Sequence, residues 1–221
     1  MKRILIPLFA AISLLATSCA TSKFFSGSAT DMKDITLIEP YAYITDAFGD
    51  MPTEYQEVPS KINQELVKDL VISMGLPVRE TISMQHNQQS STAIWMRRLV
   101  DMSSATAKEL VVPEEILSAV LESGCRYGMV VSDVGYLKNA KQYNLEKGIE
   151  TGGKVIDFIF NNELNFGSNT DAFQNGMASL IFDSQSGKVV WFGSQPRRFK
   201  KNPVDKQNLT KQINALFKDF K

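Results

Sequence analysis

Hydrophobic residues at helical spacing dominate the first half of the chain. Between residues 59 and 74 they recur every three or four positions, as on the buried face of an amphipathic helix. These positions are Ile62, Leu66, Val67, Leu70, Val71 and Met74. Gly75 follows as a C-terminal cap. Similar spacing predicts further helices over residues 92–102, from Pro113 to Gly124, and over residues 209–220.

β-Branched and aromatic residues mark two strands in the same half. Residues 35–44, ITLIEPYAYI, predict a strand in which Pro40 marks a bulge or an edge position. Residues 77–84 alternate between hydrophobic and polar types and predict another strand. Residues 45–57, which include a Gly-Asp-Met-Pro run, predict a loop.

The second half of the chain changes to strands. Residues 127–137, YGMVVSDVGYL, predict one strand, and residues 154–166 alternate as in a half-buried antiparallel strand. MASLIFD and KVVWFG, residues 177–183 and 188–193, flank the short turn sequence SQSG and predict a hairpin. The predicted order is β-α-β-α-α-β-β-β-β-α. This order favours an α+β fold with helices packed on a mixed, largely antiparallel sheet, in a single domain over residues 34–221.

A short apolar segment opens the chain. Two basic residues precede the apolar run of residues 4–16, which is the layout of a secretory signal over residues 1–18. The run is shorter than the roughly 20 residues that cross a bilayer as a helix. It ends in Ala16-Thr17-Ser18-Cys19, which resembles the lipobox of bacterial lipoproteins except that Ala16 stands where Leu is usual.

The lipobox resemblance implies that Cys19 carries a diacylglycerol and becomes the first residue of the mature chain. Several acyl chains on one residue make a durable membrane anchor. Residues 19–33 then form the acylated cysteine and a flexible tether of mostly small and polar residues. No acidic run follows Cys19, which favours the outer membrane and its periplasmic side. The alternative is an ordinary secreted protein whose cysteine happens to lie near the cleavage site.

Charge and cysteine content narrow the function classes. The 24 basic and 24 acidic residues balance, and no basic stripe is present, which argues against nucleic-acid binding. After lipidation Cys125 is the only free thiol. No second cysteine lies near it in the sequence, so we expect a buried, inert side chain rather than a redox group.

The sequence contains few motifs that are typical of catalytic or metal sites. His86, the single histidine, lies among Gln and Asn without a second ligand at metal spacing, and no serine-hydrolase elbow is present. We therefore expect no metal, no cofactor and no catalytic residue. Asp133, Asp157 and Glu163 lie on predicted strands, where such acids are usually solvated. The alternative is an envelope glycan hydrolase in which two of these carboxylates flank a cleft.

Two groups of residues are candidates for recognition. Trp95, Arg97 and Arg98 combine an aromatic ring with two guanidinium groups, types that are enriched at interfaces. After the hairpin, a basic cluster could meet phospholipid headgroups or an acidic partner, and it consists of Arg197, Arg198, Lys200 and Lys201. The alternative places Trp95 in the core and leaves the arginines solvated.

The C-terminal half also resembles a known superfamily. YGMVVSDVGYL and ASLIFDSQSGKVVWFG are similar to segments of the envelope lipoproteins that include the curli secretion lipoprotein, the lipoprotein activators of penicillin-binding proteins and the N-terminal domain of the Tol translocation protein. The resemblance implies a non-enzymatic α+β module that binds another envelope protein. The membrane-inserted hairpins of the secretion channels have no apolar counterpart in NNELNFGSNTDAFQNG (residues 161–176), which argues against a pore.

Overall fold

The computed structural model describes residues 21–48, 51–84, 87–138, 173–199 and 202–220. Strands over these ranges form one mixed sheet in the order β1-β8-β7-β6-β2-β5, with β3 beside β6 and β4 beside β3. The strands are β1 (Thr21–Phe24), β2 (Ile35–Ile38), β3 (Tyr41–Phe48), β4 (Met51–Tyr55), β5 (Val78–Ile82), β6 (Tyr127–Leu137), β7 (Phe173–Asp183) and β8 (Val189–Phe199). The α+β class with a mixed, largely antiparallel sheet is confirmed.

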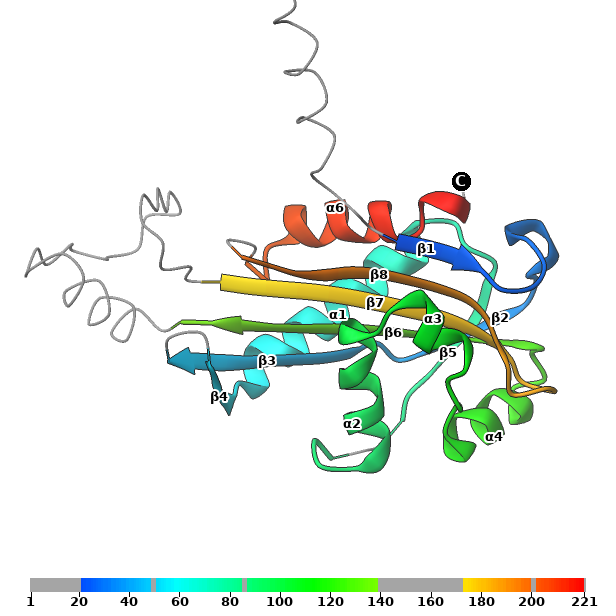
Figure 1. The fold of residues 1–221 in the computed structure, drawn as a ribbon, viewed down its shortest axis with the longest axis horizontal. Helices are drawn as coiled ribbons and strands as arrows, with labels where there is room; N and C mark the ends of the chain where they lie inside the picture. The colour runs from blue at the N-terminus through cyan, green and yellow to red at the C-terminus, as the bar shows by residue number, and fades with distance from the viewer. Residues whose placement is uncertain (1–20, 49–50, 85–86, 139–172, 200–201, 221) are drawn as a thin grey trace, which may run out of the picture.

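Helices cover both faces of the sheet (Figure 1). One face carries α1 (Glu57–Ser73) and α6 (Lys206–Leu216). The opposite face carries α2 (Ser91–Arg98), the 3₁₀ helix η2 (Leu99–Asp101), α3 (Ser104–Lys108) and α4 (Glu114–Glu122). Short 3₁₀ turns at Ala29–Asp31 and Lys218–Phe220 complete the described elements.

The central strand β6 explains why both faces must be covered. Its side chains alternate, so that Met129 and Val131 pack under α1 and α6, while Val130 and Val134 pack under the α2–α4 layer. Every residue from Gly128 to Tyr136 is buried. The sequence of a strand that is buried on both faces is expected to be nearly continuously hydrophobic, as in YGMVVSDVGYL.

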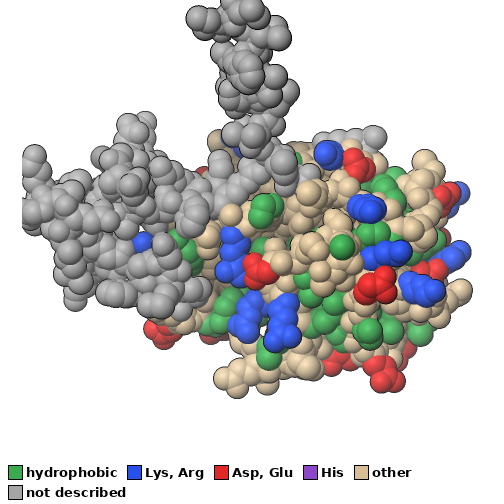
Figure 2. Space-filling view, in the orientation of Figure 1, with side chains coloured by type: hydrophobic (Ala, Val, Ile, Leu, Met, Phe, Trp, Pro, Cys, Tyr) green, Lys and Arg blue, Asp and Glu red, His purple; other side chains and the backbone are tan. Residues whose placement is uncertain are grey.

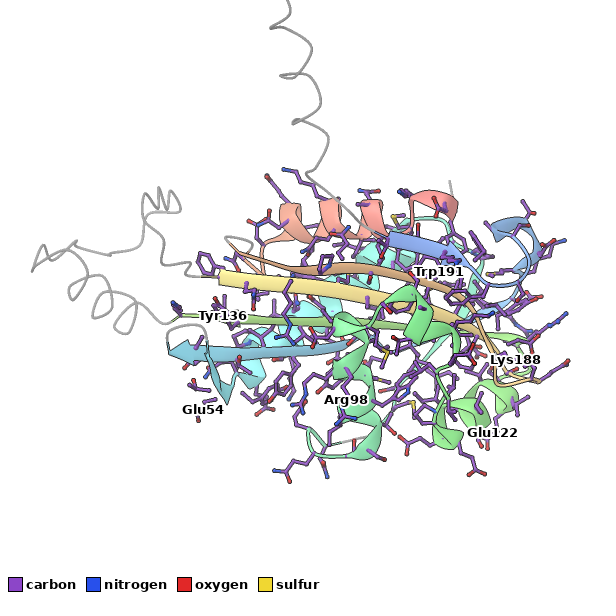
Figure 3. All side chains as sticks on the ribbon, in the orientation of Figure 1. Glu54, Arg98, Glu122, Tyr136, Lys188 and Trp191 are labelled. Carbon is purple, nitrogen blue, oxygen red and sulfur yellow. The ribbon has the colours of Figure 1, made fainter. Side chains whose placement is uncertain are left out.

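An aromatic cluster packs on the sheet at β8. Trp191 is fully buried, stacks on Phe217 at 5.4 Å between ring centroids and meets Phe220 edge-on at 5.1 Å. Figure 3 shows Trp191 well away from Tyr136, which lies near the far end of β6. The aromatic cluster therefore packs against one end of the strands, and Tyr136 lies towards the other end (Figure 3).

The structure confirms most of the predicted elements. The helix expected over residues 59–74 is α1, the strand over residues 127–137 is β6, and the predicted hairpin is β7 and β8. The helix predicted over residues 92–102 ends its α-helical part at Arg98 and continues as η2. The strand predicted over residues 154–166 lies outside the described residues.

Two predictions in the first half are wrong. The strand of residues 35–44 is two strands, β2 and β3, because Pro40 has no N–H to continue the ladder. Both pair in parallel with β6, so together they act as one interrupted strand. The loop of residues 45–57 is also wrong, since β3 runs on to Phe48 and β4 pairs back against it.

The tether prediction is corrected for the residues that the structure describes. Thr21–Phe24 is β1, antiparallel to β8, and its register places Phe24 opposite Trp191. Phe24 approaches the ring of Trp191 at 6.4 Å and that of Phe220 at 5.5 Å. The small and polar composition of the segment hid this contact, which comes from a single aromatic side chain.

Candidate functional site: the Arg97–Arg197 pocket

The fold brings together two of the residues that the sequence analysis proposed for recognition. Arg97 on α2 and Arg197 on β8 both line a cavity of about 260 Å³. Arg98 is exposed on the same helix as Arg97 and does not line this cavity (Figure 3). Arg198 lies in β8 opposite Asn175. The cavity-lining residues are Tyr43, Thr45, Thr53, Arg97, Val134, Gly135, Tyr136, Gln174 and Arg197.

Trp95 belongs to a different environment. Its indole Nε1–H donates a hydrogen bond to the Val111 carbonyl at 3.1 Å, and its ring packs at the edge of the core between the sheet and α2–α4. Trp95 is partly buried and does not line the cavity, so its role in recognition stays a prediction. The aromatic residues that line the pocket are instead Tyr43 and Tyr136 from the sheet.

Local contacts fix the position of Arg97. Ser90 caps α2, since its side chain accepts a hydrogen bond from the Ala93 N–H at 3.1 Å. At the other end of the helix, the buried Ser132 hydroxyl of β6 donates to the Met96 carbonyl at 2.7 Å. Because Met96 itself is fully buried, the next residue is held at the helix edge above β3 and β6.

A tyrosine forms the floor under Arg97. The Arg97 guanidinium carbon lies 4.7 Å from the ring centroid of Tyr43, which is a cation–π contact. Tyr43 in turn stacks on Tyr41 at 6.3 Å and on Tyr55 at 5.3 Å between centroids. Burial raises the pKa of the Tyr41 phenol, while Arg97 opposes that rise, and the phenol donates to Gln88 Oε1 at 2.6 Å.

The charge of Arg197 is paired with a carboxylate, but its hydrogen-bond donors are only partly satisfied. Arg197 Nη2 lies 2.9 Å from Asp101 Oδ2. Within the described part of the chain, the buried Arg197 Nε has no hydrogen-bond partner, and neither has the buried hydroxyl of Thr45. None of the lining residues that the structure describes is acidic. Figure 2 shows basic side chains gathered over α2 beside acidic ones. The pocket therefore carries positive charge and hydrogen-bond donors.

The parallel pairing of β3 with β6 builds the pocket. Tyr43 pairs with Val134, and Thr45 pairs with Tyr136. The parallel register joins residues about 90 positions apart, so the local sequence does not predict the pairing. The alternating tyrosines of the YAYITD segment do place two aromatic rings on one face of this strand.

Asp133 differs from its prediction as a solvated strand acid. It is 1% exposed and points under α1, where Asn63 Nδ2 donates to its Oδ2. Burial raises the pKa of the Asp133 carboxyl to about 7, although hydrogen bonding to Asn63 and Asn175 lowers it. Asn175 also donates to Gln212 Oε1 on α6 at 3.0 Å. Asp133 is thus part of a buried polar cluster of amides rather than an accessible acid.

The remaining candidates from the sequence are one cysteine, two acids, one histidine and two lysines. Cys125 is 3% exposed, so its expected burial is confirmed. Outside the described residues lie Asp157, Glu163, His86, Lys200 and Lys201. Over the described ranges, no group of three or more His, Cys, Asp or Glu side chains is arranged to hold a metal ion. Those ranges also contain no helix that is both long and apolar enough to cross a membrane.

Comparisons with known proteins give only a distant likeness. No protein-family model matches the sequence, and no curated protein matches it. Solved structures are similar at low identity, among them the following three. A PelC dodecamer from Paraburkholderia phytofirmans has 10% identity and a TM-score of 0.39, covering 91% of this chain and 96% of that one.

The other two structures are more distant. A DUF4136 family protein from Bacteroides thetaiotaomicron has 10% identity and a TM-score of 0.34, with 91% of this chain and 94% of that one covered. The C-terminal domain of LpoB from Salmonella enterica has 9% identity and a TM-score of 0.33, with 80% and 87% covered. The likeness is one of general arrangement, and no residue of the site is carried over from it.

Proposed function

We propose that the protein is a lipid-anchored, non-enzymatic module of the bacterial cell envelope, held by Cys19 at the periplasmic side of the outer membrane. In this proposal it binds another envelope component through the Arg97–Arg197 pocket. The lipobox-like sequence before Cys19 supports the anchor. The observation that carries the binding role is the pocket itself, which two arginines line and in which the described lining residues include no acid.

A membrane anchor suits a binding module. Confinement to the membrane surface raises the effective concentration of the protein against other membrane-bound components. Arginine on an aromatic floor is a common recognition feature, because the guanidinium loses little freedom when it binds. The glycan-hydrolase alternative gains no support from Asp133, whose carboxyl is buried and bonded to an amide.

Replacing the lipid-bearing cysteine tests the anchor. We expect Cys19→Ser to move the protein from the membrane fraction to the soluble periplasmic fraction, because acylation needs the thiol. Cys125→Ser is the matched control, since Cys125 is buried in the fold, and this variant should stay with the membrane. Fractionation and immunoblotting measure both. Continued membrane association of Cys19→Ser would contradict the proposal.

Site-directed photo-cross-linking in cells tests the binding role. A benzoylphenylalanine at Thr53, an exposed residue that lines the pocket, should give a discrete adduct with an envelope component. The same group at Leu121, which is 52% exposed on α4, should not. We expect Arg97→Gln to remove the Thr53 adduct. An adduct from Leu121 alone would place binding on another surface.

A further inference from the structure

We infer that the Arg97–Arg197 pocket binds a carboxylate, carried either by the C-terminus or by an acidic side chain of a partner polypeptide. This inference rests on the proposed function and adds the chemical class of the ligand. It follows from three features of the pocket: its net charge, its unsatisfied donors and its size.

The net charge of the pocket fits a monoanion. Arg97 and Arg197 contribute two positive charges, and Asp101 neutralises one of them through its 2.9 Å contact with Arg197. One positive charge remains on Arg97, whose guanidinium carbon lies 4.7 Å from the Tyr43 ring centroid in a cation–π contact. A carboxylate balances this charge, whereas a phosphate dianion would leave one negative charge in excess.

Among the buried donors that have no hydrogen-bond partner in the described part of the chain, the Arg197 Nε–H and the Thr45 hydroxyl belong to residues that line the cavity. Buried donors of this kind are normally satisfied in folded proteins. Arg197 uses Nη2 for Asp101, and its Nε–H remains for a second acceptor. A carboxylate accepts through two oxygens and satisfies such donors together.

The walls limit the size of the ligand. The cavity of about 260 Å³ is bounded by Tyr43, Tyr136 and Val134, which are packed in the sheet. This volume holds one small residue with its carboxylate. The exposed Thr53 at the cavity margin leaves a direction in which a longer polypeptide can continue.

A pair of probes that differ only in charge tests the inference. The full-length chain, purified in detergent, is titrated with N-acetylglycine and with N-acetylglycinamide while the Arg ¹⁵Nε–¹H resonances are followed by NMR. We expect N-acetylglycine to shift the Arg197 Nε–H resonance downfield with saturation. The uncharged amide should bind at least tenfold more weakly. Equal binding of the two probes would overturn the inference.

Further probes distinguish the source and the class of anion. N-acetylglutamate methylamide presents a side-chain carboxylate, so tighter binding of this probe indicates an acidic side chain, and tighter binding of N-acetylglycine indicates a chain terminus. Either result supports a carboxylate site. Inorganic phosphate at the same ionic strength should bind at least fivefold more weakly, and tighter phosphate binding would contradict the charge argument.

Variants locate the binding. Arg97→Gln should weaken N-acetylglycine binding at least tenfold, and Thr45→Val about threefold, because each removes a donor to the carboxylate. Arg98→Gln is the matched control on the same helix and should bind as the unaltered chain does. Arg97→Lys keeps the charge and serves if Arg97→Gln unfolds, as judged by circular dichroism, since losing the planar fork should still weaken binding severalfold. Unchanged affinity in the folded Arg97 variants would overturn the assignment.

Failure of the inference is separable from failure of the proposed function. If the Thr53 adduct forms in cells and depends on Arg97 but N-acetylglycine and N-acetylglutamate methylamide do not bind, the carboxylate assignment is wrong and the binding role stands. If the two carboxylates bind but no adduct forms from Thr53, the pocket chemistry stands and the proposed envelope partner does not.

Discussion

Asp133 shows how one residue can couple the packing of two helices to pH. It lies on β6 beneath α1 and α6, and its neighbours in the buried cluster are Asn63, Asn175 and Gln212. Removing an ionised carboxylate from water is costly unless charges or hydrogen bonds compensate. Here the hydrogen-bond partners are neutral amides, so burial prevails and raises the pKa of the Asp133 carboxyl to about 7.

Replacing Asp133 by Asn should therefore stabilise the protein in a pH-dependent way. A raised folded pKa means that the unaltered protein loses stability as pH rises from about 4 to about 7, where the unfolded chain has already released its proton. We expect Asp133→Asn to raise the free energy of unfolding by about 2–4 kcal/mol at pH 8, at about 1.4 kcal/mol per pKa unit. At pH 4 the difference should be small. Chemical denaturation at both pH values measures it.

Asp183 provides the control of opposite sign. Burial alone would raise the pKa of the Asp183 carboxyl, but the Arg126 guanidinium at 2.8 Å and the turn amides of Gln185 and Ser186 hold it below the usual value. A lowered folded pKa contributes stability above about pH 4 that disappears as pH falls. Asp183→Asn should thus destabilise the protein at pH 7 and much less at pH 3. If both variants changed stability equally at all pH values, packing rather than ionisation would be the cause.

Among the elements, β1 has one aromatic anchor in addition to its polar contacts, such as the one between the hydroxyls of Thr21 and Ser194. It contains four residues and is an edge strand, and its polar pattern alone would not keep it folded. Phe24 anchors it, because its ring reaches both Trp191 and Phe220 on the side of the sheet covered by α6. The strand, the end of α6 and β8 are therefore joined by a common aromatic cluster.

Removing the Phe24 ring should release β1 from the sheet. We expect Phe24→Ala to lower the free energy of unfolding by about 1–2 kcal/mol, less than for a fully buried phenylalanine because the ring is half-buried. Hydrogen exchange at the backbone amides of β1 should accelerate at least tenfold. Lys23→Ala, on the exposed face of the same strand, should change stability by less than about 0.5 kcal/mol. Unchanged exchange in Phe24→Ala would show that backbone pairing alone holds the strand.

The sequence predicted elements well where a periodic pattern ran through the whole element. The stripe from Ile62 to Met74 and the run of residues 127–137 mark α1 and β6 because burial acts at every turn or every second residue. β1 and β4 were missed because their stability comes from partners distant in sequence or from a hairpin partner, and not from their own composition.

The site was only partly predictable for a similar reason. Arg97 and Arg197 were proposed as interface residues because of their type, and the fold does bring them to one pocket. Tyr43, Thr45 and Tyr136 were not proposed, because they join the site only through the parallel register of β3 with β6. The burial of Asp133 was missed because alternation distinguishes the two faces of a strand but not whether a helix covers the second face.

At the scale of the whole molecule, the proposed anchor at Cys19 lies close in sequence to the first strand of the sheet. β1 begins at Thr21, two positions after Cys19. An extended chain spans about 3.6 Å per residue, so the proposed lipid attachment would lie within about 7 Å of the sheet edge formed by β1 and β8. Figure 1 shows α4 on the other side of the molecule from β1. The proposed anchor therefore dictates which end of the domain is closest to the bilayer.

Fluorescence quenching in proteoliposomes tests this orientation. In the lipidated, full-length chain carrying Cys125→Ser, a fluorophore is attached at Lys23→Cys on β1 or at Leu121→Cys on α4, both of which replace exposed residues. A nitroxide on the lipid headgroups should quench the label at position 23 at least twofold and leave the label at position 121 nearly unchanged. The difference is expected because two residues of tether cannot lift β1 beyond the headgroup region, whereas Glu122, the neighbour of Leu121 on α4, lies well away from Trp191, the β8 partner of Phe24 (Figure 3). Insertion of twenty Gly and Ser residues between Ala20 and Thr21 should reduce the quenching at position 23, since such a linker lets the domain move away from the surface. Equal quenching at both positions in the uninserted chain would contradict the short connection between anchor and sheet.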